Sequence, residues 1–139
     1  MFAGNLLDPG SISVRLRELV ILRTCARCGC EYEWGVHVAL FAQQADLRPD
    51  DIASTLQIDR SRLELPPSER MLFDVVDELH DTSTIGDQTW AALTAQFSTA
   101  QILEVIALVG TYHAVSFQAN ALNLDPEPFA PRFSVYLQR

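Results

Sequence analysis

Residues 13–37 read SVRLRELVILRTCARCGCEYEWGVH, two apolar-periodic stretches separated by Gly29. Ser13 can cap a helix, so the spacing predicts a first helix over residues 13–28. Gly29 interrupts that pattern, and a second helix is predicted over residues 30–45. The segment therefore indicates a helical rather than a β-rich protein.

The second predicted helix carries three ionisable groups on one face. Cys30, Glu33 and His37 follow the spacing i, i+3, i+7, which aligns them along two turns. Trp34 and Phe41 fall on the same face, where we expect them to pack first and to line a pocket second. Cys30 also lies at the predicted N-terminus, where the helix dipole favours a thiolate. This pattern is typical of positions where pKa values are tuned for chemistry.

Two other helices each direct one ionisable group toward apolar residues. Glu18 falls within the apolar stripe of the first helix, where a carboxylate is costly unless it is paired or protonated. His113 falls among apolar residues of a later helix. Both are candidate site residues, and each has a structural alternative. Glu18 can pair with an arginine, and a core histidine can bond a carbonyl group.

The rest of the chain continues the helical pattern, without strand-like alternation. Further helices are predicted over residues 49–56, 67–80, 87–96 and 102–122, with a capping box at Ser98 and Gln101. Residues 1–12 are predicted to be an irregular lead-in with a turn at Asp8, Pro9 and Gly10, and residues 125–139 an extended arm. The prediction is one all-α domain over residues 1–139, with about six helices.

Composition excludes several classes of protein. The chain has 139 residues, of which 48% are hydrophobic, enough for one domain with a core. The net charge of −8 and the absence of lysine disfavour binding to nucleic acid or to an anionic membrane surface. No apolar run approaches the roughly 18 residues that span a bilayer. No secretory signal is visible either.

The three cysteines lie close together in the sequence, at positions 25, 28 and 30. An odd, clustered set is a poor disulfide framework, so we expect a reducing cytoplasm. Cys25 and Cys28 are predicted to be small core residues. A zinc site formed by the three thiols and His37 is disfavoured, because thiolates on a continuous helix do not easily close a tetrahedron. Neither a metal nor a cofactor is predicted.

Residues 17–37 resemble the signature segment of the carboxymuconolactone decarboxylase and alkylhydroperoxidase D-like superfamily. Glu18, Cys30 and His37 match the Glu, first Cys and His of that signature, and residues 110–123 are similar to the closing helix of the family. The resemblance implies a helical subunit in a homo-oligomer, a trimer or hexamer, with a small-molecule site near a subunit interface.

The superfamily contains two activities, decarboxylation of a muconolactone and reduction of hydroperoxides through a Cys-x-x-Cys pair assisted by the Glu and His. This chain departs from the peroxidase pattern, because Glu33 stands three residues after Cys30 in place of the second cysteine. Cys25 and Cys28 form a Cys-x-x-Cys, but upstream of that position and in a different register to His37.

Three hypotheses follow. In the leading one, Glu33 and His37 exchange protons with a small organic acid or lactone, Glu18 orients or tunes His37, and Cys30 lines the pocket. The predicted pocket walls are Trp34, Phe41 and His113. The second is a thiol peroxidase in which Cys30 reacts and Cys28 or an outside thiol resolves it. The third is a non-catalytic oligomeric protein that binds a small molecule.

Overall fold

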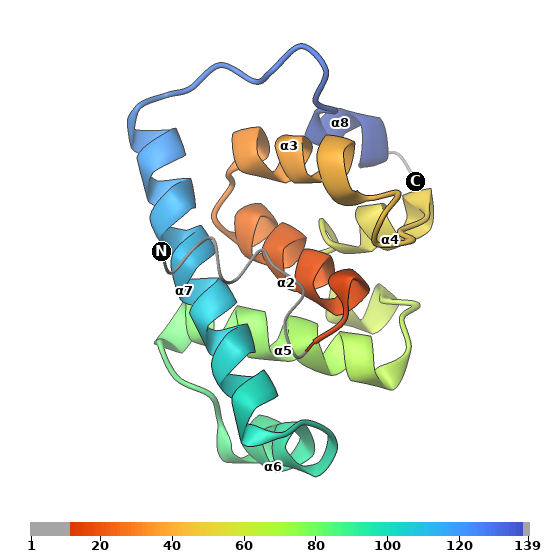
Figure 1. Cartoon of the computed structure of the whole chain (residues 1–139), viewed down its shortest axis with the longest axis vertical. Coiled ribbons are helices and arrows are strands. Elements are labelled where there is room, and N and C mark those ends of the chain that lie inside the picture. The colour runs from red at the N-terminus through yellow and green to blue at the C-terminus, as the bar shows by residue number, and fades with distance from the viewer. Residues whose placement is uncertain (1–11, 138–139) are drawn as a thin grey trace.

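The computed structural model describes residues 12–137, and all regular structure in that range is helical (Figure 1). The elements are α2 (Val14–Arg27), α3 (Glu31–Phe41), α4 (Pro49–Ser54), η1 (Arg60–Arg62), α5 (Pro67–Thr82), α6 (Asp87–Gln96), α7 (Thr99–Ala121) and α8 (Phe133–Tyr136). The predicted all-α class is confirmed. The lead-in predicted over residues 1–12, with its turn, lies outside the described residues except for Ile12.

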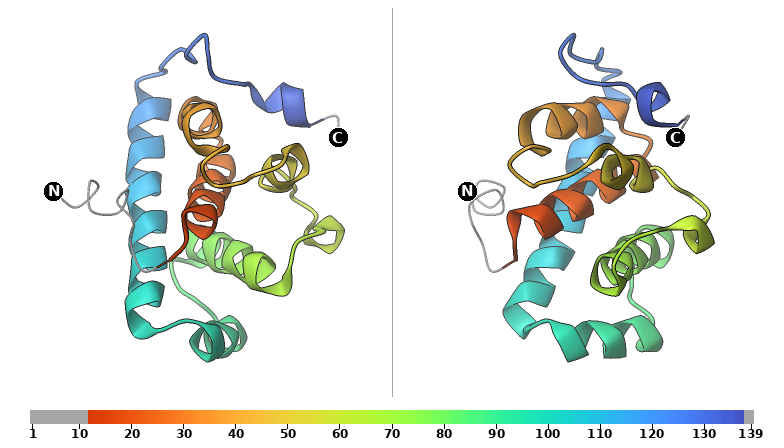
Figure 2. Two further views of the ribbon diagram at one scale, coloured as in Figure 1. Left: turned by 45° about the vertical axis from the view of Figure 1, so that its right-hand side comes forward. Right: turned by 90° about the vertical axis from the view of Figure 1, so that its right-hand side faces the viewer.

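The centre of the molecule is α2, which packs against α3, α5 and α7 (Figures 1 and 2). Ser13 caps it by accepting a hydrogen bond from the backbone N–H of Leu16. Four consecutive residues are buried whichever way they point: Leu19, Val20, Ile21 and Leu22. An apolar run that occupies every side of a helix must be covered on every side, which explains the central position of this part of α2. Glu18 comes immediately before this run and is therefore carried into the core.

The connection between α2 and α3 depends on Gly29, whose φ of 62° is a left-handed conformation that glycine adopts at little cost. Cys30 then occupies the N-cap position of α3. The second helix was predicted to reach residue 45, but α3 ends at Phe41. Residues 42–46 form turns instead, and Asp46 closes them with a φ of 54°. Helical periodicity in the sequence does not distinguish a helix from such a series of turns.

The longest helix, α7, begins with the predicted capping box, in which Ser98 and Gln101 bond to one another's backbone. Val105, Leu108 and Tyr112 are buried on one face. Within residues 12–137, α7 alone is long and apolar enough to cross a membrane by length and composition. This corrects the expectation that no stretch reaches that limit. One face of α7 packs against α2, and 33% of this apolar stretch is buried.

The chain after α7 arches over the end of α3 and then forms α8, a short helix that the sequence did not predict (Figure 1). Phe133 and Tyr136 of α8 meet the ring of Trp34 edge to face, with centroids 5.0 and 5.6 Å apart. The arm passes so close to α3 that a Cβ on Gly35 would lie 2.6 Å from the carbonyl oxygen of Pro131. Phe133 and Tyr136 of the predicted arm are therefore partly covered by their own subunit, whereas Phe129 is 59% exposed.

Candidate active site

Helices α2 and α3 bring Glu18, His37 and Glu33 into one hydrogen-bonded row, here called the His37 relay. Oε2 of Glu18 lies 2.9 Å from Nδ1 of His37, and Oε1 of Glu33 lies 3.2 Å from Nε2. The side chains of Glu18, His37 and Glu33 are 1%, 4% and 19% exposed. The row therefore runs from the core toward the surface. Arg17 adds a nearby positive charge, 3.9 Å from Oε1 of Glu18.

The charge state of His37 follows from these neighbours. Burial lowers its pKa, but hydrogen bonds to Glu18 and Glu33, with their negative charges, outweigh burial and raise the pKa to about 9. At neutral pH both ring nitrogens therefore carry protons, and each donates to a carboxylate. A histidine in this state can release a proton from Nε2 and later recover it, while Glu18 holds the other nitrogen.

Two aromatic rings enclose the relay. The ring of Phe41 lies tilted against His37 with centroids 4.9 Å apart, and the ring of Tyr112 meets it edge-on at 5.1 Å. Burial, followed by the charges of Glu18 and Glu33, raises the pKa of Tyr112 well above its ordinary value. The phenol therefore stays neutral. Tyr112 was not among the predicted site residues, although its spacing from buried Val105 and Val109 on α7 marks it as inward-facing.

Two predicted pocket residues lie elsewhere. Nε2 of His113 is 2.8 Å from Nδ1 of His80, and its ring also packs against Phe117. Nε1 of Trp34 donates to Oγ1 of Thr55 at 3.0 Å, on the side of α3 that α8 covers. The structure therefore brings Glu18, Glu33, His37 and Phe41 together, and it places His113 and Trp34 in different surroundings.

Cys30 lies at the start of α3 and is completely buried. Its backbone N–H donates to the carbonyl oxygen of Cys25 at 2.8 Å, so the thiol sits beside the end of α2. All three cysteines are free. Burial, reinforced by the neighbouring Cys30, raises the pKa of the Cys25 thiol well above its ordinary value. Cys25 is buried as predicted, whereas Cys28 is only half-buried.

The family model for the carboxymuconolactone decarboxylase family matches residues 1–75, more than half of the chain. The chain belongs to the carboxymuconolactone decarboxylase family. The matched segment includes α2 and α3, and hence the whole of the His37 relay and Cys30. The resemblance noted in the sequence is confirmed. None of the curated proteins matches the chain.

Three solved structures share the fold of this chain. A protein of unknown function from Agrobacterium tumefaciens, described as a candidate antioxidant defence protein AhpD, superposes with a TM-score of 0.81 and 18% identity, covering 91% of this chain and 86% of that chain. An uncharacterised peroxidase-related protein from Silicibacter sp. gives 0.81 and 18%, covering 95% and 70%. An uncharacterised peroxidase-related protein with an alkylhydroperoxidase AhpD core, from Ralstonia eutropha, gives 0.78 and 18%, covering 91% and 67%. At this identity the likeness shows the fold alone.

Two cavities lie within the described residues 12–137, and none of the three relay residues lines either of them. One, of about 670 Å³, is lined by residues of α4, the segment that follows it and the end of the chain, including Arg48, Asp51 and Tyr136. The other, of about 340 Å³, lies where α3 begins and α7 ends, beside Tyr32 and Asn120. Glu33 is the most exposed member of the relay.

Proposed function

We propose that the His37 relay performs acid–base chemistry on a small organic acid or lactone, as in the decarboxylase branch of the family. The observation that carries the proposal is a buried imidazole held between two carboxylates, one of them partly exposed. Groups with strongly perturbed pKa values cluster at catalytic sites, because catalysis needs a proton held at a defined atom.

In a decarboxylation the carbon–carbon bond to the carboxylate breaks, carbon dioxide leaves, and the electron pair that stays behind must receive a proton. Nε2 of His37 is placed to supply that proton, since Glu18 holds Nδ1. Glu33 lies between Nε2 and the surface, so it can accept a proton from the substrate or return one to His37. Phe41 and Tyr112 exclude water from the ring, which strengthens these charge interactions.

The test compares His37 with a residue outside the relay. His37→Gln should reduce turnover of a carboxylated lactone by about 10²–10⁴-fold, because one general acid or base contributes about that much. Asp87→Asn is the control, since Asp87 is exposed at the start of α6, and it should retain full turnover. Circular dichroism should show both variants folded. Full activity in His37→Gln would overturn the proposal.

A second candidate, thiol-dependent hydroperoxide reduction, is favoured by one observation. Cys30 occupies the N-cap position of α3, where the helix dipole favours a thiolate. Complete burial of Cys30 and the carboxylate of Glu33 in place of a second thiol argue against it. If this candidate is correct, the protein consumes hydroperoxide, Cys30 forms a sulfenate or disulfide, and Cys30→Ser is inactive.

The non-catalytic alternative would be supported by a folded protein that binds carboxylated lactones but turns over neither lactones nor hydroperoxides. The leading proposal keeps the other predictions unchanged. These are a small-molecule partner, no cofactor, no nucleic acid or membrane partner, and a cytoplasmic location.

We also propose that the protein is a homo-oligomer whose interface includes the outer face of α7. Leu103 and Phe117 are each 61% exposed on this face, and Gly110 between them leaves open space for a neighbour. Large exposed apolar residues in a row are typical of interfaces. Phe117→Glu should therefore lower the mass measured by sedimentation, whereas Ile58→Glu, at an isolated exposed position, should not. An unchanged mass in Phe117→Glu would contradict the proposed interface.

A further inference from the structure

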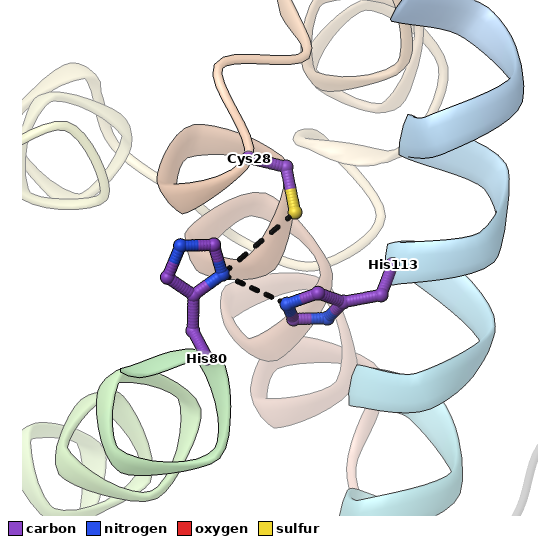
Figure 3. Close-up of side chains that lie close together, drawn as sticks. All are labelled: Cys28, His80 and His113. Carbon is purple, nitrogen blue, oxygen red and sulfur yellow. Dashed lines mark hydrogen bonds between the residues drawn. The ribbon is translucent and has the colours of Figure 1, made fainter. Parts of the chain in front are cut away.

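A second group of ligand-type atoms lies outside the His37 relay. Cys28 at the end of α2, His80 near the end of α5 and His113 in the middle of α7 point toward one another (Figure 3). Nδ1 of His80 is 2.8 Å from Nε2 of His113 and 4.0 Å from Sγ of Cys28. The three ligand atoms all lie within 4.8 Å of one another. These three residues are called the Cys28 cluster.

The orientation of His113 is fixed by its own helix. Its Nδ1 lies 2.7 Å from the carbonyl oxygen of Val109, and because a carbonyl only accepts, Nδ1 carries the proton. The lone pair of the ring is therefore on Nε2, the atom that faces His80. Histidines that bind metals usually donate their other N–H to a carbonyl or carboxylate in this way.

His80 completes the pair of imidazoles. Since Nε2 of His113 accepts, the proton between the rings belongs to Nδ1 of His80. A neutral His80 that shifts its proton to Nε2 would offer a second lone pair at the same point.

Cys28 supplies a sulfur ligand that remains half-buried. Ser116 is completely buried, one turn after His113 on α7, and its hydroxyl makes no hydrogen bond of ordinary geometry. This hydroxyl is thus available to support a thiolate, the form in which cysteine binds metals.

We propose that Cys28, His80 and His113 bind one zinc ion, with the fourth coordination position open. Nitrogen and sulfur ligands together suit zinc, and three protein ligands with an open position are typical of reactive rather than structural zinc sites. Ligand atoms around tetrahedral zinc lie about 3.3–3.6 Å apart. The separations of 2.8 and 4.0 Å fall on either side of this range, so small side-chain movements suffice.

This site differs from the zinc site considered from the sequence, which combined three thiols of neighbouring residues with His37. The ligands here come from three different helices, so they can converge on one point, as ligands on a single helix cannot. The position is also reachable from solvent, because all three residues are only partly buried. Binding at this site does not depend on the function proposed for the His37 relay.

The test uses the reduced, full-length protein after treatment with a chelator. Calorimetric titration with Zn²⁺ should give one ion per chain, and Co²⁺ should produce the thiolate-to-metal charge-transfer band and the visible bands of a tetrahedral site. Cys28→Ser, His80→Gln and His113→Gln should each weaken Zn²⁺ binding by at least about 100-fold, more than the loss of a residue that only orients a ligand. Cys25→Ala is the matched control and should keep the affinity, because Cys25 lies on α2 outside the cluster.

Two results would overturn the proposal. One is Zn²⁺ binding that His80→Gln leaves unchanged; this variant is decisive if His113→Gln fails to fold, because His80 lies near a partly exposed helix end. The other is loss of the cobalt–thiolate band in Cys25→Ala but not in Cys28→Ser, which would assign the ion to a different set of thiols. Absence of any one-to-one binding would have the same meaning.

Discussion

The His37 relay and the Cys28 cluster both contain histidines that lie beside α2. The neighbouring residues favour a protonated ring in His37 and a neutral ring in His80. Glu18 and Glu33 raise the pKa of His37 to about 9, whereas burial and His113 lower the pKa of His80. His37 therefore holds a proton at each nitrogen, and His80 tends to lose one. The imidazole of His37 is therefore suited to proton transfer, and that of His80 is suited to donating a lone pair.

The largest effect is expected from breaking the inner contact of the relay. Glu18→Gln removes a carboxylate that is 1% exposed and leaves the charge of His37 without its buried partner. We expect the free energy of unfolding at neutral pH to fall by about 3 kcal/mol, as for other buried pairs that lose one member. Urea unfolding measures this change.

Glu33→Gln is the matched control for that variant. Glu33 contacts the other nitrogen of the same ring, but its side chain is 19% exposed, so water replaces part of what is lost. Its cost should stay below about 1 kcal/mol. If Glu18→Gln and Glu33→Gln lower the free energy of unfolding equally, burial does not determine how much each carboxylate contributes to stability.

The next effect concerns alkaline pH. The pKa of His37 is about 9 in the folded protein, against an ordinary value of 6.5, so its stabilising contribution is complete below pH 6.5 and is lost as the pH rises through 9. Over that window the free energy of unfolding should fall by about 3 kcal/mol or less. Urea unfolding between pH 6 and 10 measures the slope.

His37→Gln isolates this contribution. Burial also raises the pKa of the Cys25 thiol, so this group makes the free energy of unfolding fall further at alkaline pH. This second contribution is present in both the parent protein and His37→Gln. The difference between the two curves therefore reports His37 alone. Parallel curves would mean that the relay does not hold an extra proton.

A smaller effect of opposite sign is expected at acid pH. The pKa of His80 is lowered in the folded protein, so the unfolded chain binds more protons as the pH falls through 6.5, and stability decreases. His80→Gln should show less of this decrease between pH 7.5 and 5.5, above the range in which most carboxylates titrate. A steeper decrease in His80→Gln than in the parent would contradict the assigned charge state.

The contrast between the two regions also explains what the sequence could predict. Glu33 and His37 lie on one helix, so helical spacing was enough to predict that they share a face, and the family resemblance linked Glu18 to them. The Cys28 cluster joins the ends of α2 and α5 to the middle of α7, and only the packing angles between helices bring these residues together.

His113 shows the limit of helical spacing most directly. Its position on α7 indicated that it lies among apolar residues, but it could not indicate which helix it would meet. Tyr112, the preceding residue, faces His37 instead. Adjacent residues on a helix point about 100° apart, so His113 and Tyr112 meet different neighbours.

The smallest expected effect belongs to Ser116, whose buried hydroxyl makes no hydrogen bond of ordinary geometry. Ser116→Ala should change the free energy of unfolding by no more than about 0.5 kcal/mol, because little hydrogen bonding is lost. The same variant should raise the pKa of the Cys28 thiol further, since Ser116 opposes the effect of burial there. Thiol reactivity measured against pH reports that shift.

Thr55 is the matched control for Ser116, as a second hydroxyl that is completely buried. Its oxygen accepts from Nε1 of Trp34 at 3.0 Å and donates to the carbonyl of Ile52 at 2.7 Å. Thr55→Val leaves the indole N–H buried without a partner and should cost about 1–3 kcal/mol. If Ser116→Ala costs as much as Thr55→Val, the Ser116 hydroxyl already has a strong partner and is not available to the Cys28 thiolate. If it costs nothing while the thiol pKa rises, the hydroxyl acts on the sulfur, which is what a metal-binding thiolate at this position requires.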